Sequence, residues 1–344
     1  MNLSDKNILI TGGAGFIGSH LSKSMVDIAG QVKVIDNLSS GRISNLRGCI
    51  NKSNFKFIKG DLLKPRILAD VVKDCEMVFH LSANSEVRAG VNNPKIDFDQ
   101  NLKATHNLLE TLRKSKSIET LVFTSSSTVY GEPSVIPTPE GYGSMKPISL
   151  YGASKLGCES LISAHSNLYN FNSIIYRFAN VVGSRSTHGV IFDFINKLNA
   201  DNRELEILGN GNQTKSYIHV SDVIDAILLS LKKVERNIEI FNIGSEDQVN
   251  VKTIAEIVAS EMGLKNTNMK CKGGDEGRGW PGDVEFMMLD IQKIKQLGWR
   301  PKYNSFDSVR LATKEIIEDL RSAFFLEPCF NEIVEVRIRN QIRI

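Results

Sequence analysis

The chain has 344 residues, of which 41% are hydrophobic and 24% are charged, and its 42 basic and 39 acidic residues give a net charge of +3. These values predict a soluble globular protein with a large core, and they argue against a nucleic-acid binder, because no basic run is interleaved with aromatic residues. No apolar stretch reaches the roughly 20 residues of a membrane span, and the N-terminus lacks a signal-peptide core, so we expect a cytoplasmic protein.

Strand-like and helix-like segments alternate through the first half of the chain. The predicted strands are Asn7–Thr11, Val32–Asp36, Phe55–Lys59, Met77–Leu81, Thr120–Ser125 and Ser173–Arg177. The predicted helices are Phe16–Ile28, a stretch after Pro65, Pro94–Lys114 and the segment that carries Tyr151, which follows a loop rich in Pro and Gly, Gly131–Pro147. This alternation predicts an α/β fold of Rossmann type, a doubly wound parallel sheet with helices on both faces.

After about Val182 the pattern becomes more irregular. Short strands are predicted at Glu204–Leu208, Lys215–Val220 and Glu239–Ile243, and helices at Asp222–Lys232, Val251–Met262 and Asp307–Arg321. We therefore expect one domain over residues 1–182 and a smaller α/β lobe over residues 183–322 that returns segments to the main sheet. Residues 323–344 form an extension of unknown role, whose alternating end predicts an edge strand or a poorly ordered tail.

The cysteines give no sign of a metal site or of a disulfide framework. They are odd in number and never form a Cys-x-x-Cys pair, and the six histidines form no His-x-x-x-His pair. Reduced thiols and no bound metal are therefore expected. The cysteines are Cys49, Cys75, Cys158, Cys271 and Cys329.

A glycine-rich turn joins the first predicted strand to the first predicted helix. Gly12, Gly15 and Gly18 allow a tight turn, close approach of the backbone to a pyrophosphate, and close packing of the helix on the sheet. Asp36 ends the second strand, where a carboxylate accepts hydrogen bonds from the adenosine ribose and repels a 2′-phosphate. The pattern therefore predicts NAD as the cofactor, held by residues 1–182, with Asp61 placed to reach the adenine.

Tyr151 and Lys155 are four residues apart on a predicted helix and so share one face. An ammonium group beside a phenol favours the phenolate, so we expect Lys155 to lower the pKa of Tyr151. The pair thus predicts a phenolic general base.

Seven segments in order resemble the extended short-chain dehydrogenase/reductase family, and among its members the nucleotide-sugar 4-epimerases. The resemblance covers about residues 5 to 320. The segments are Thr11–His20, Asp36–Gly41, Gly60-Asp61, His80–Ala83, Phe123–Gly131, Tyr151–Lys155 and Arg177–Gly183.

The resemblance implies the roles of the reacting residues. Tyr151 is the catalytic base, Lys155 holds the nicotinamide ribose, and Ser126 hydrogen-bonds the sugar O4. The 4,6-dehydratases of the family carry an Asp-Glu pair where this chain has Ser127 and Thr128, which favours hydride removal and return without elimination. The cofactor contacts that it implies are Gly12, Gly15, Phe16, Ile17, Gly18, Asp36, Asn37, Ser39, Gly41, Asp61, Leu62, Leu81, Ala83, Asn101, Ser125, Tyr151, Lys155 and Phe178.

The resemblance also implies a substrate site for a UDP-sugar. Lys215 stands where an arginine is usual, and it offers a charge without a bidentate fork. Met287 stands where a tyrosine would restrict the site to plain hexoses, so an N-acetyl group has more room. The implied substrate contacts are Asn84, Arg88, Ser126, Tyr151, Asn180, Val190, Ile191, Lys215, Arg278, Asp283 and Met287.

The function expected from these features is an NAD-dependent UDP-sugar 4-epimerase that interconverts UDP-glucose and UDP-galactose through a 4-keto intermediate. Three alternatives remain open: a UDP-N-acetylglucosamine or UDP-glucuronate 4-epimerase, a nucleotide-sugar oxidoreductase, and a non-catalytic dinucleotide-binding scaffold. The family also implies a homodimer that pairs the helix near Asn101–Lys114 with the helix that carries Tyr151.

Overall fold

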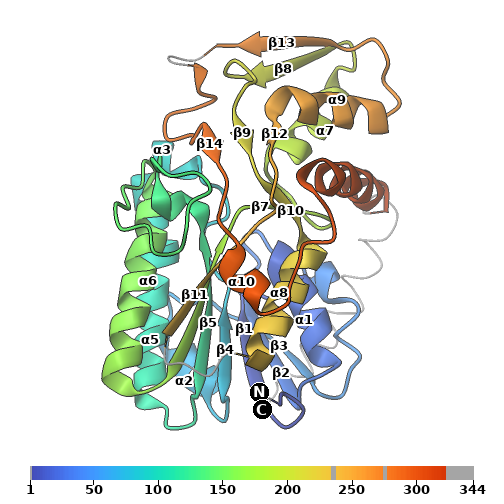
Figure 1. Cartoon of the computed structure of the whole chain (residues 1–344). Coiled ribbons are helices and arrows are strands. Elements are labelled where there is room, and N and C mark those ends of the chain that lie inside the picture. The colour runs from blue at the N-terminus through green and yellow to red at the C-terminus, as the bar shows by residue number, and fades with distance from the viewer. Residues whose placement is uncertain (1, 234–237, 274–276, 323–344) are drawn as a thin grey trace.

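A seven-stranded, fully parallel sheet forms the centre of the molecule in this computed structural model, which describes residues 2–233, 238–273 and 277–322 (Figure 1). The strand order is β11-β6-β5-β4-β1-β2-β3, so the order reverses between β1 and β4. The predicted doubly wound α/β class is confirmed. The strands are β1 (Asn7–Thr11), β2 (Gln31–Asp36), β3 (Phe55–Lys59), β4 (Met77–His80), β5 (Thr120–Ser126), β6 (Asn172–Phe178) and β11 (Ile238–Ile243).

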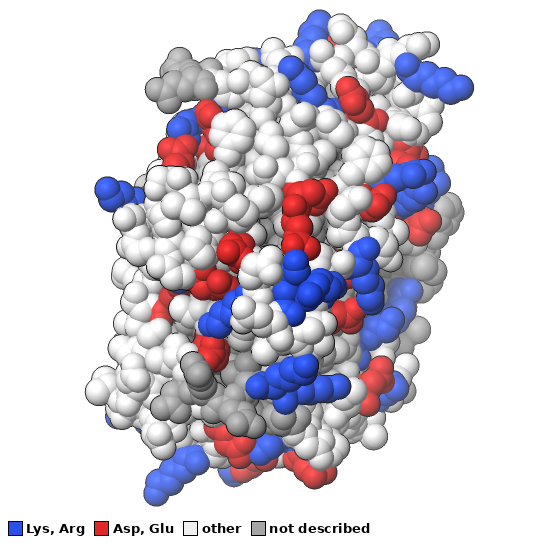
Figure 2. All heavy atoms as spheres, in the orientation of Figure 1, with Lys and Arg blue, Asp and Glu red and all other residues white. Residues whose placement is uncertain are grey.

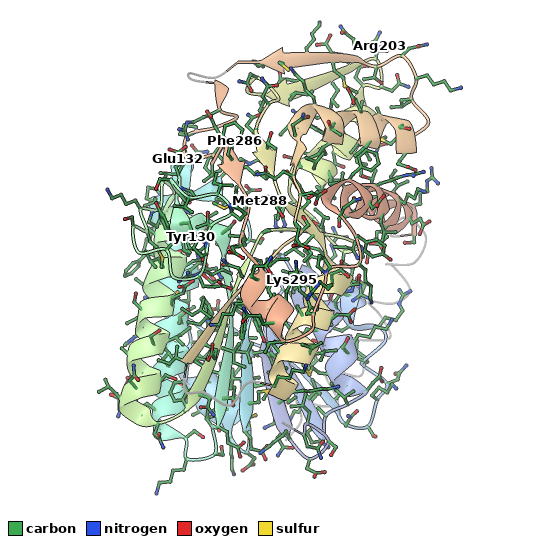
Figure 3. The ribbon with its side chains drawn as sticks, viewed as in Figure 1. Tyr130, Glu132, Arg203, Phe286, Met288 and Lys295 are labelled. Atoms are coloured by element: carbon green, nitrogen blue, oxygen red, sulfur yellow. The ribbon has the colours of Figure 1, made fainter. Side chains whose placement is uncertain are left out.

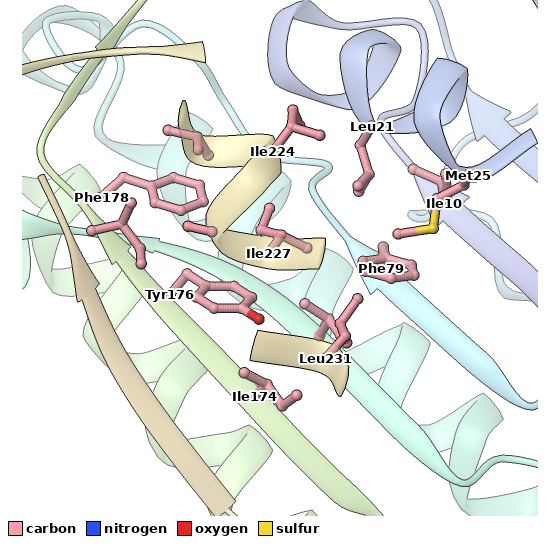
Figure 4. Packing of buried hydrophobic residues seen from close by; sticks show 14 of the residues in the cluster. Ile10, Leu21, Met25, Phe79, Ile174, Tyr176, Phe178, Ile224, Ile227 and Leu231 are labelled. Carbon is pink, nitrogen blue, oxygen red and sulfur yellow. The ribbon is translucent and has the colours of Figure 1, made fainter. Parts of the chain in front are cut away.

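Helices cover both faces of the sheet because its strands carry apolar side chains on both sides. Along β1, Ile8 and Ile10 belong to one core cluster and Leu9 to the other. The first cluster lies under α1 (Phe16–Val26) and α8 (Val220–Lys233) (Figure 4). The second lies under α2 (Pro65–Val72), α5 (Ala104–Lys114) and α6 (Leu150–Tyr169). Short 3₁₀ turns, η1 (Ile43–Leu46) and η3 (Ser127–Tyr130), follow β2 and β5.

The helix predicted over Pro94–Lys114 is wrong in one respect, since it is not a uniform α-helix. It consists of α4 (Pro94–Asp97), a π-helical turn η2 (Phe98–Lys103) and α5, and the short helix α3 (Ala89–Asn92) precedes it. A π turn holds an extra residue. Here it accompanies two buried polar side chains, Asp97 and Asn101, each only 1% exposed.

Smaller sheets and helices follow the sixth strand. Strand β7 (Asn180–Val182) pairs with β10 (Tyr217–His219), and β8 (Glu204–Leu208) with β13 (Asn268–Lys272). Strand β9 (Thr214–Lys215) lies between β12 (Val249–Asn250) and β14 (Phe286–Met287). The helices are α7 (Val190–Ala200), α9 (Val251–Glu261), α10 (Gln292–Gln296) and a helix over residues 305–322.

The single strand predicted over Lys215–Val220 is also wrong, because β9 and β10 belong to different sheets. Ser216 makes the change of sheet: its amide donates to Met287 on the β14 side, and its carbonyl accepts from Asn180 on the β7 side. A change of sheet at a single residue is not visible in an apolar pattern, because such a pattern reports burial and not which strand is the neighbour.

The surface in Figure 2 carries lysine and arginine side chains among aspartates and glutamates, with wide uncharged areas between them. Within the described ranges, no helix is both long enough and apolar enough to cross a bilayer. The tail expected over residues 323–344 lies outside the described residues, as does Cys329.

Candidate active site

A cavity of about 410 Å³ lies at the carboxyl ends of the parallel strands. Its wall includes residues that follow β1 (Phe16, Ile17), β4 (Glu86, Arg88) and β5 (Ser126). Residues of β7, α7 and β9 and the segment 279–287 close the other side. Open parallel sheets bind their ligands at this edge, beside the point where the strand order reverses.

Ser126 and Tyr151 both line the wall of this cavity. Ser126 ends β5, and its hydroxyl oxygen accepts hydrogen bonds from the Thr128 amide at 3.2 Å and the Thr128 hydroxyl at 3.0 Å. Tyr151 lies in the first turn of α6. Gly152 allows that turn to approach η3, because a Cβ added at Gly152 would lie 2.6 Å from the Thr128 carbonyl oxygen.

Lys155 lies behind Tyr151 and is 3% exposed. Its ammonium nitrogen donates to the Thr124 carbonyl at 2.9 Å and lies 5.8 Å from the centroid of the Tyr151 ring. Burial lowers the pKa of Lys155 to about 8, against the opposing influence of Cys158, Glu159 and Asp97. Lys155 is therefore still mostly protonated at neutral pH.

The expectation that Lys155 lowers the pKa of Tyr151 is wrong for the protein alone. Burial raises the pKa of Tyr151, and the charges of Asp97 and Cys158 raise it further. Desolvation of the phenolate thus outweighs any help from the ammonium, which is turned toward the Thr124 carbonyl.

The glycine loop is held by close backbone contacts. Gly12 has a φ of +69°, and a Cβ there would lie 2.8 Å from the Ser82 amide nitrogen. A Cβ at Gly18 would lie 2.1 Å from the Gly12 carbonyl oxygen. Gly15 is the N-cap of α1 and has no side chain to cap the helix. The backbone amides of the first turn are therefore not bound by a capping side chain.

The Asp36 carboxylate links β2 to this loop. It accepts hydrogen bonds from the Ala14 amide at 3.0 Å and the Leu38 amide at 2.8 Å, and burial raises its pKa. Gly41 packs against both carboxylate oxygens. Each oxygen keeps lone pairs for a further donor, such as a ribose hydroxyl. The bare helix end and this carboxylate fit an adenine dinucleotide.

The cofactor residues predicted from the sequence divide into two groups. Phe16, Ile17, Ser125, Tyr151 and Phe178 line the cavity. The others lie outside its lining: Gly12, Gly15, Gly18, Asp36, Asn37, Ser39, Gly41, Asp61, Leu62, Leu81, Ala83, Asn101 and Lys155. Asn37 and Asp61 lie next to each other, with the amide nitrogen 3.5 Å from the carboxylate, at the ends of β2 and β3.

Most of the predicted substrate residues also line the cavity, namely Arg88, Asn180, Val190, Ile191, Lys215, Asp283 and Met287. The two basic residues among them are each paired with acids of the protein. Arg88 contacts Glu86 at 3.1 Å and Asp193 at 3.0 Å, and Lys215 contacts Asp283 at 2.6 Å.

Two predicted substrate residues lie outside the cavity lining. Arg278 is 2.6 Å from Glu132 and donates to the carbonyl of Asp283, so its guanidinium is held at the rim, where Figure 3 labels Glu132 and Phe286. Asn84 donates to the buried carboxylate of Asp97 instead of facing the cavity.

Several residues in or behind the wall are marked by no sequence pattern. Glu86, His188, Asp193 and Trp280 line the cavity. Behind it, Arg177 and Glu159 form a buried ion pair at 2.7 Å, and Glu159 also accepts from Ser125. These residues come from separate strands and helices and share no spacing pattern. Within the described ranges, no cluster of three or more His, Cys, Asp or Glu is arranged to hold a metal ion.

Comparisons with known proteins agree with this geometry. The family model described as GDP-mannose 4,6 dehydratase matches residues 9–311. A putative UDP-glucose 4-epimerase of Methanocaldococcus jannaschii is 35% identical over 310 residues, which cover 88% of this chain and 96% of that protein.

Solved structures of three epimerases have the same fold. A UDP-galactose 4-epimerase has a TM-score of 0.80 at 38% identity, covering 91% of this chain and 99% of its own. A UDP-N-acetylglucosamine 4-epimerase from Methanobrevibacter ruminantium, in complex with UDP-N-acetylmuramic acid, has a TM-score of 0.81 at 29% identity, covering 92% and 99%. A UDP-glucuronic acid 4-epimerase from Bacillus cereus, with UDP-glucuronic acid and NAD, has a TM-score of 0.81 at 26% identity, covering 91% and 99%. The chain therefore belongs to the extended short-chain dehydrogenase/reductase family, among its nucleotide-sugar epimerases and dehydratases.

Proposed function

We propose that this chain is an NAD-dependent UDP-sugar 4-epimerase, in which residues 1–182 bind the dinucleotide and residues 183–322 bind the sugar nucleotide. The observation that carries the proposal is that Ser126 and Tyr151 line one cavity together with Ser127 and Thr128. By resemblance, a dehydratase would present two acids at those last two positions. Hydroxyls there favour a reaction that moves a hydride and a proton without expelling water.

The proton chemistry follows from the hydrogen bonds of the wall. Ser126 already accepts two hydrogen bonds from Thr128, so its own hydroxyl hydrogen remains for the sugar O4. Tyr151, in its phenolate form, takes the O4 proton when the sugar is oxidised and returns it when the sugar is reduced; this requires positive charge in the ligand-bound site to offset the burial that raises the pKa of Tyr151 in the protein alone. A bound NAD would supply the acceptor of the C4 hydride in its oxidised form and the hydride donor in its reduced form.

Inversion at C4 requires the 4-keto sugar to present its other face while the diphosphate stays bound. Lys215 and Arg88 are the basic groups of the wall placed on the substrate side, each now held by a carboxylate. We propose that they contact the diphosphate, and that Asn180 supports them with its amide. Val190 and Ile191, at the start of α7, then lie against the nucleoside.

The preferred sugar is a neutral hexose, either plain or N-acetylated. Met287 is 2% exposed and gives the wall a flexible apolar side chain next to the sugar. Arg88 and Lys215 are assigned to the diphosphate, and Lys197, the remaining lining lysine or arginine among the described residues, pairs with Glu206, which supports a neutral sugar over a uronate.

The test is to incubate the protein separately with UDP-glucose, UDP-N-acetylglucosamine and UDP-glucuronate and to resolve the C4 epimers. We expect epimers of the first two without net NADH. Stoichiometric NADH would contradict the proposal in favour of an oxidoreductase, and loss of water from the sugar would contradict it in favour of a dehydratase.

We also propose a homodimer. Large apolar side chains are exposed on η2 and α6, including Phe98 (54%), Leu150 (47%) and Leu168 (72%). Light scattering of the purified protein should give twice the chain mass of 38.2 kDa. A monomer at micromolar concentration would contradict this.

A further inference from the structure

Asp97 is a buried acid behind the cavity that the proposed reaction does not use. It is 1% exposed, and its Oδ2 atom has no hydrogen-bond partner among the described residues. Among the described residues, no lysine or arginine forms an ion pair with Asp97. Gly90 packs directly against the Oδ2 atom of Asp97: a Cβ added at Gly90 would lie 2.5 Å from that oxygen. Burying a carboxylate without a directly paired cation is costly.

The other oxygen of Asp97 joins two parts of the site. It accepts from the Asn84 side chain at 2.9 Å and from the Asn101 side chain at 3.2 Å. Asn84 begins the segment that reaches the cavity at Glu86 and Arg88. Asp97 therefore anchors one edge of the cavity wall.

Asn101 carries the connection to the catalytic helix. Its amide donates to the Ser154 hydroxyl at 2.8 Å, and that hydroxyl donates to the Tyr151 carbonyl at 2.7 Å. The side-chain oxygen of Asn101 accepts from the backbone amide of Asn84 at 2.7 Å. One chain of hydrogen bonds thus runs from Asp97 to the first turn of α6, in the part of the molecule where the π turn departs from a regular helix.

We propose that Asp97 is a positioning residue for Tyr151 and Lys155, which ties the catalytic helix to the cavity segment and places one negative charge beside the reacting groups. The proposal rests on the proposed function for its catalytic meaning. A negative charge favours the protonated form of each neighbour, and Asp97 raises the pKa of both Tyr151 and Lys155. The other ionisable groups around Lys155 are Cys158 and Glu159 of α6, His80 of β4 and Arg177 of β6.

The test is an NMR titration of Lys155 in protein labelled with [ε-¹³C]lysine, with the signal assigned by Lys155→Met. The wild-type midpoint should lie near pH 8. In Asp97→Asn we expect it to fall, because removal of the negative charge disfavours the ammonium form of Lys155. The high-pH limb of kcat should move down by the same amount.

Asp99→Asn is the matched control, because Asp99 is two residues away but contacts Lys95 and Lys103 at the surface. It should leave the midpoint unchanged. Ser154→Ala cuts the hydrogen-bond chain without changing a charge, so it should lower kcat several-fold with an unchanged midpoint. This second variant keeps the test decisive if Asp97→Asn does not fold.

An unchanged midpoint in folded Asp97→Asn, or an equal shift in Asp99→Asn, would overturn the proposal. So would a Ser154→Ala variant with wild-type kcat. The titration needs no substrate, which separates the two proposals. A shifted midpoint in a protein that epimerises no UDP-sugar overturns the proposed function but supports the placement of the charge.

Discussion

The proposed catalytic set (Ser126, Tyr151, Lys155) and the ion-paired set (Arg88, Asp193, Lys215, Asp283) lie in or beside the same cavity but are held in different ways. Lys155 donates to a backbone carbonyl, and Ser126 is fixed by Thr128. By contrast, Arg88 is held by Asp193, with the two side chains 38% and 34% exposed, and Lys215 by Asp283, at 21% and 10%.

We infer from this difference that one set acts in turnover and the other in substrate binding. Ser126 and Lys155 are held in place without a ligand, because the Thr128 amide and hydroxyl bind Ser126 and the Thr124 carbonyl binds Lys155. The ion-paired set must exchange partners, because a diphosphate competes with Asp193 and Asp283 for the same two cations. Variants of the first set should therefore change turnover, and variants of the second set should change binding.

The largest effect on turnover is expected for Tyr151→Phe. Loss of the phenolic proton carrier should lower kcat by about 10²- to 10⁴-fold, with KM within a few-fold of wild type. Steady-state kinetics on the preferred UDP-sugar measures both. Tyr142→Phe is the control, because the Tyr142 hydroxyl contacts Ser134 away from the cavity. If Tyr151→Phe kept most of its turnover, the proton would have to move through another group.

Glu159→Gln should weaken the support of the catalytic set. It leaves Arg177, which is 1% exposed, as a buried cation without its counter-ion. Breaking such a pair costs about 3–5 kcal/mol, measured as the free energy of unfolding in urea. In the matched surface variant Glu110→Gln, whose partner Arg113 lies 2.9 Å away on an exposed face, the cost should stay below about 1 kcal/mol. Equal losses in the free energy of unfolding for the two variants would show that the buried pair stabilises the protein no more than a surface pair.

The pH dependence of kcat should report Lys155. The pKa of about 8 means that the ammonium is present below pH 8 and lost above it. If the ammonium orients the site, kcat falls above pH 8, by roughly tenfold for each further pH unit. A flat profile between pH 7 and pH 9.5, with the protein still folded by circular dichroism, would contradict a role for the charge.

Lys215→Met should have the smallest of these effects and should act on binding. Lys215 is already neutralised by Asp283, so its loss should raise KM by about fivefold to tenfold with little change in kcat. Lys215→Arg keeps the positive charge and adds a bidentate fork, so its KM should equal the wild-type value or fall below it. A change in kcat alone would place Lys215 in the catalytic set.

The elements that could be predicted from sequence are those with a local pattern. The bounds of β1 and β3 agree with the predicted Asn7–Thr11 and Phe55–Lys59, because apolar runs between turn residues mark buried parallel strands. The π turn at Phe98–Lys103 was not predicted, because it depends on polar contacts with α6 and the segment after β4.

The residues of the site likewise differ in whether a sequence motif marks them. Tyr151 and Ser126 were found because they belong to motifs, and both line the cavity. Asp97 and Asp193 stand in no motif, and their positions depend on contacts with distant segments. Arg278 belongs to a motif-like segment, yet its ion pair with Glu132 holds it at the rim. Sequence spacing cannot anticipate such a contact, because the two residues are 146 positions apart in the numbering.

The pairing of β11 with β6 has a consequence for how the chain can be divided. Residues from the second half of the sequence, including Ile224, Ile227 and Leu231 of α8, pack in the same core as Ile10 and Tyr176 (Figure 4). A polypeptide ended at residue 182 would leave the edge of β6 without its neighbour and a large apolar face uncovered. Such a fragment should aggregate during expression. During synthesis on the ribosome, the sheet therefore cannot be completed until about residue 243 has left the exit tunnel.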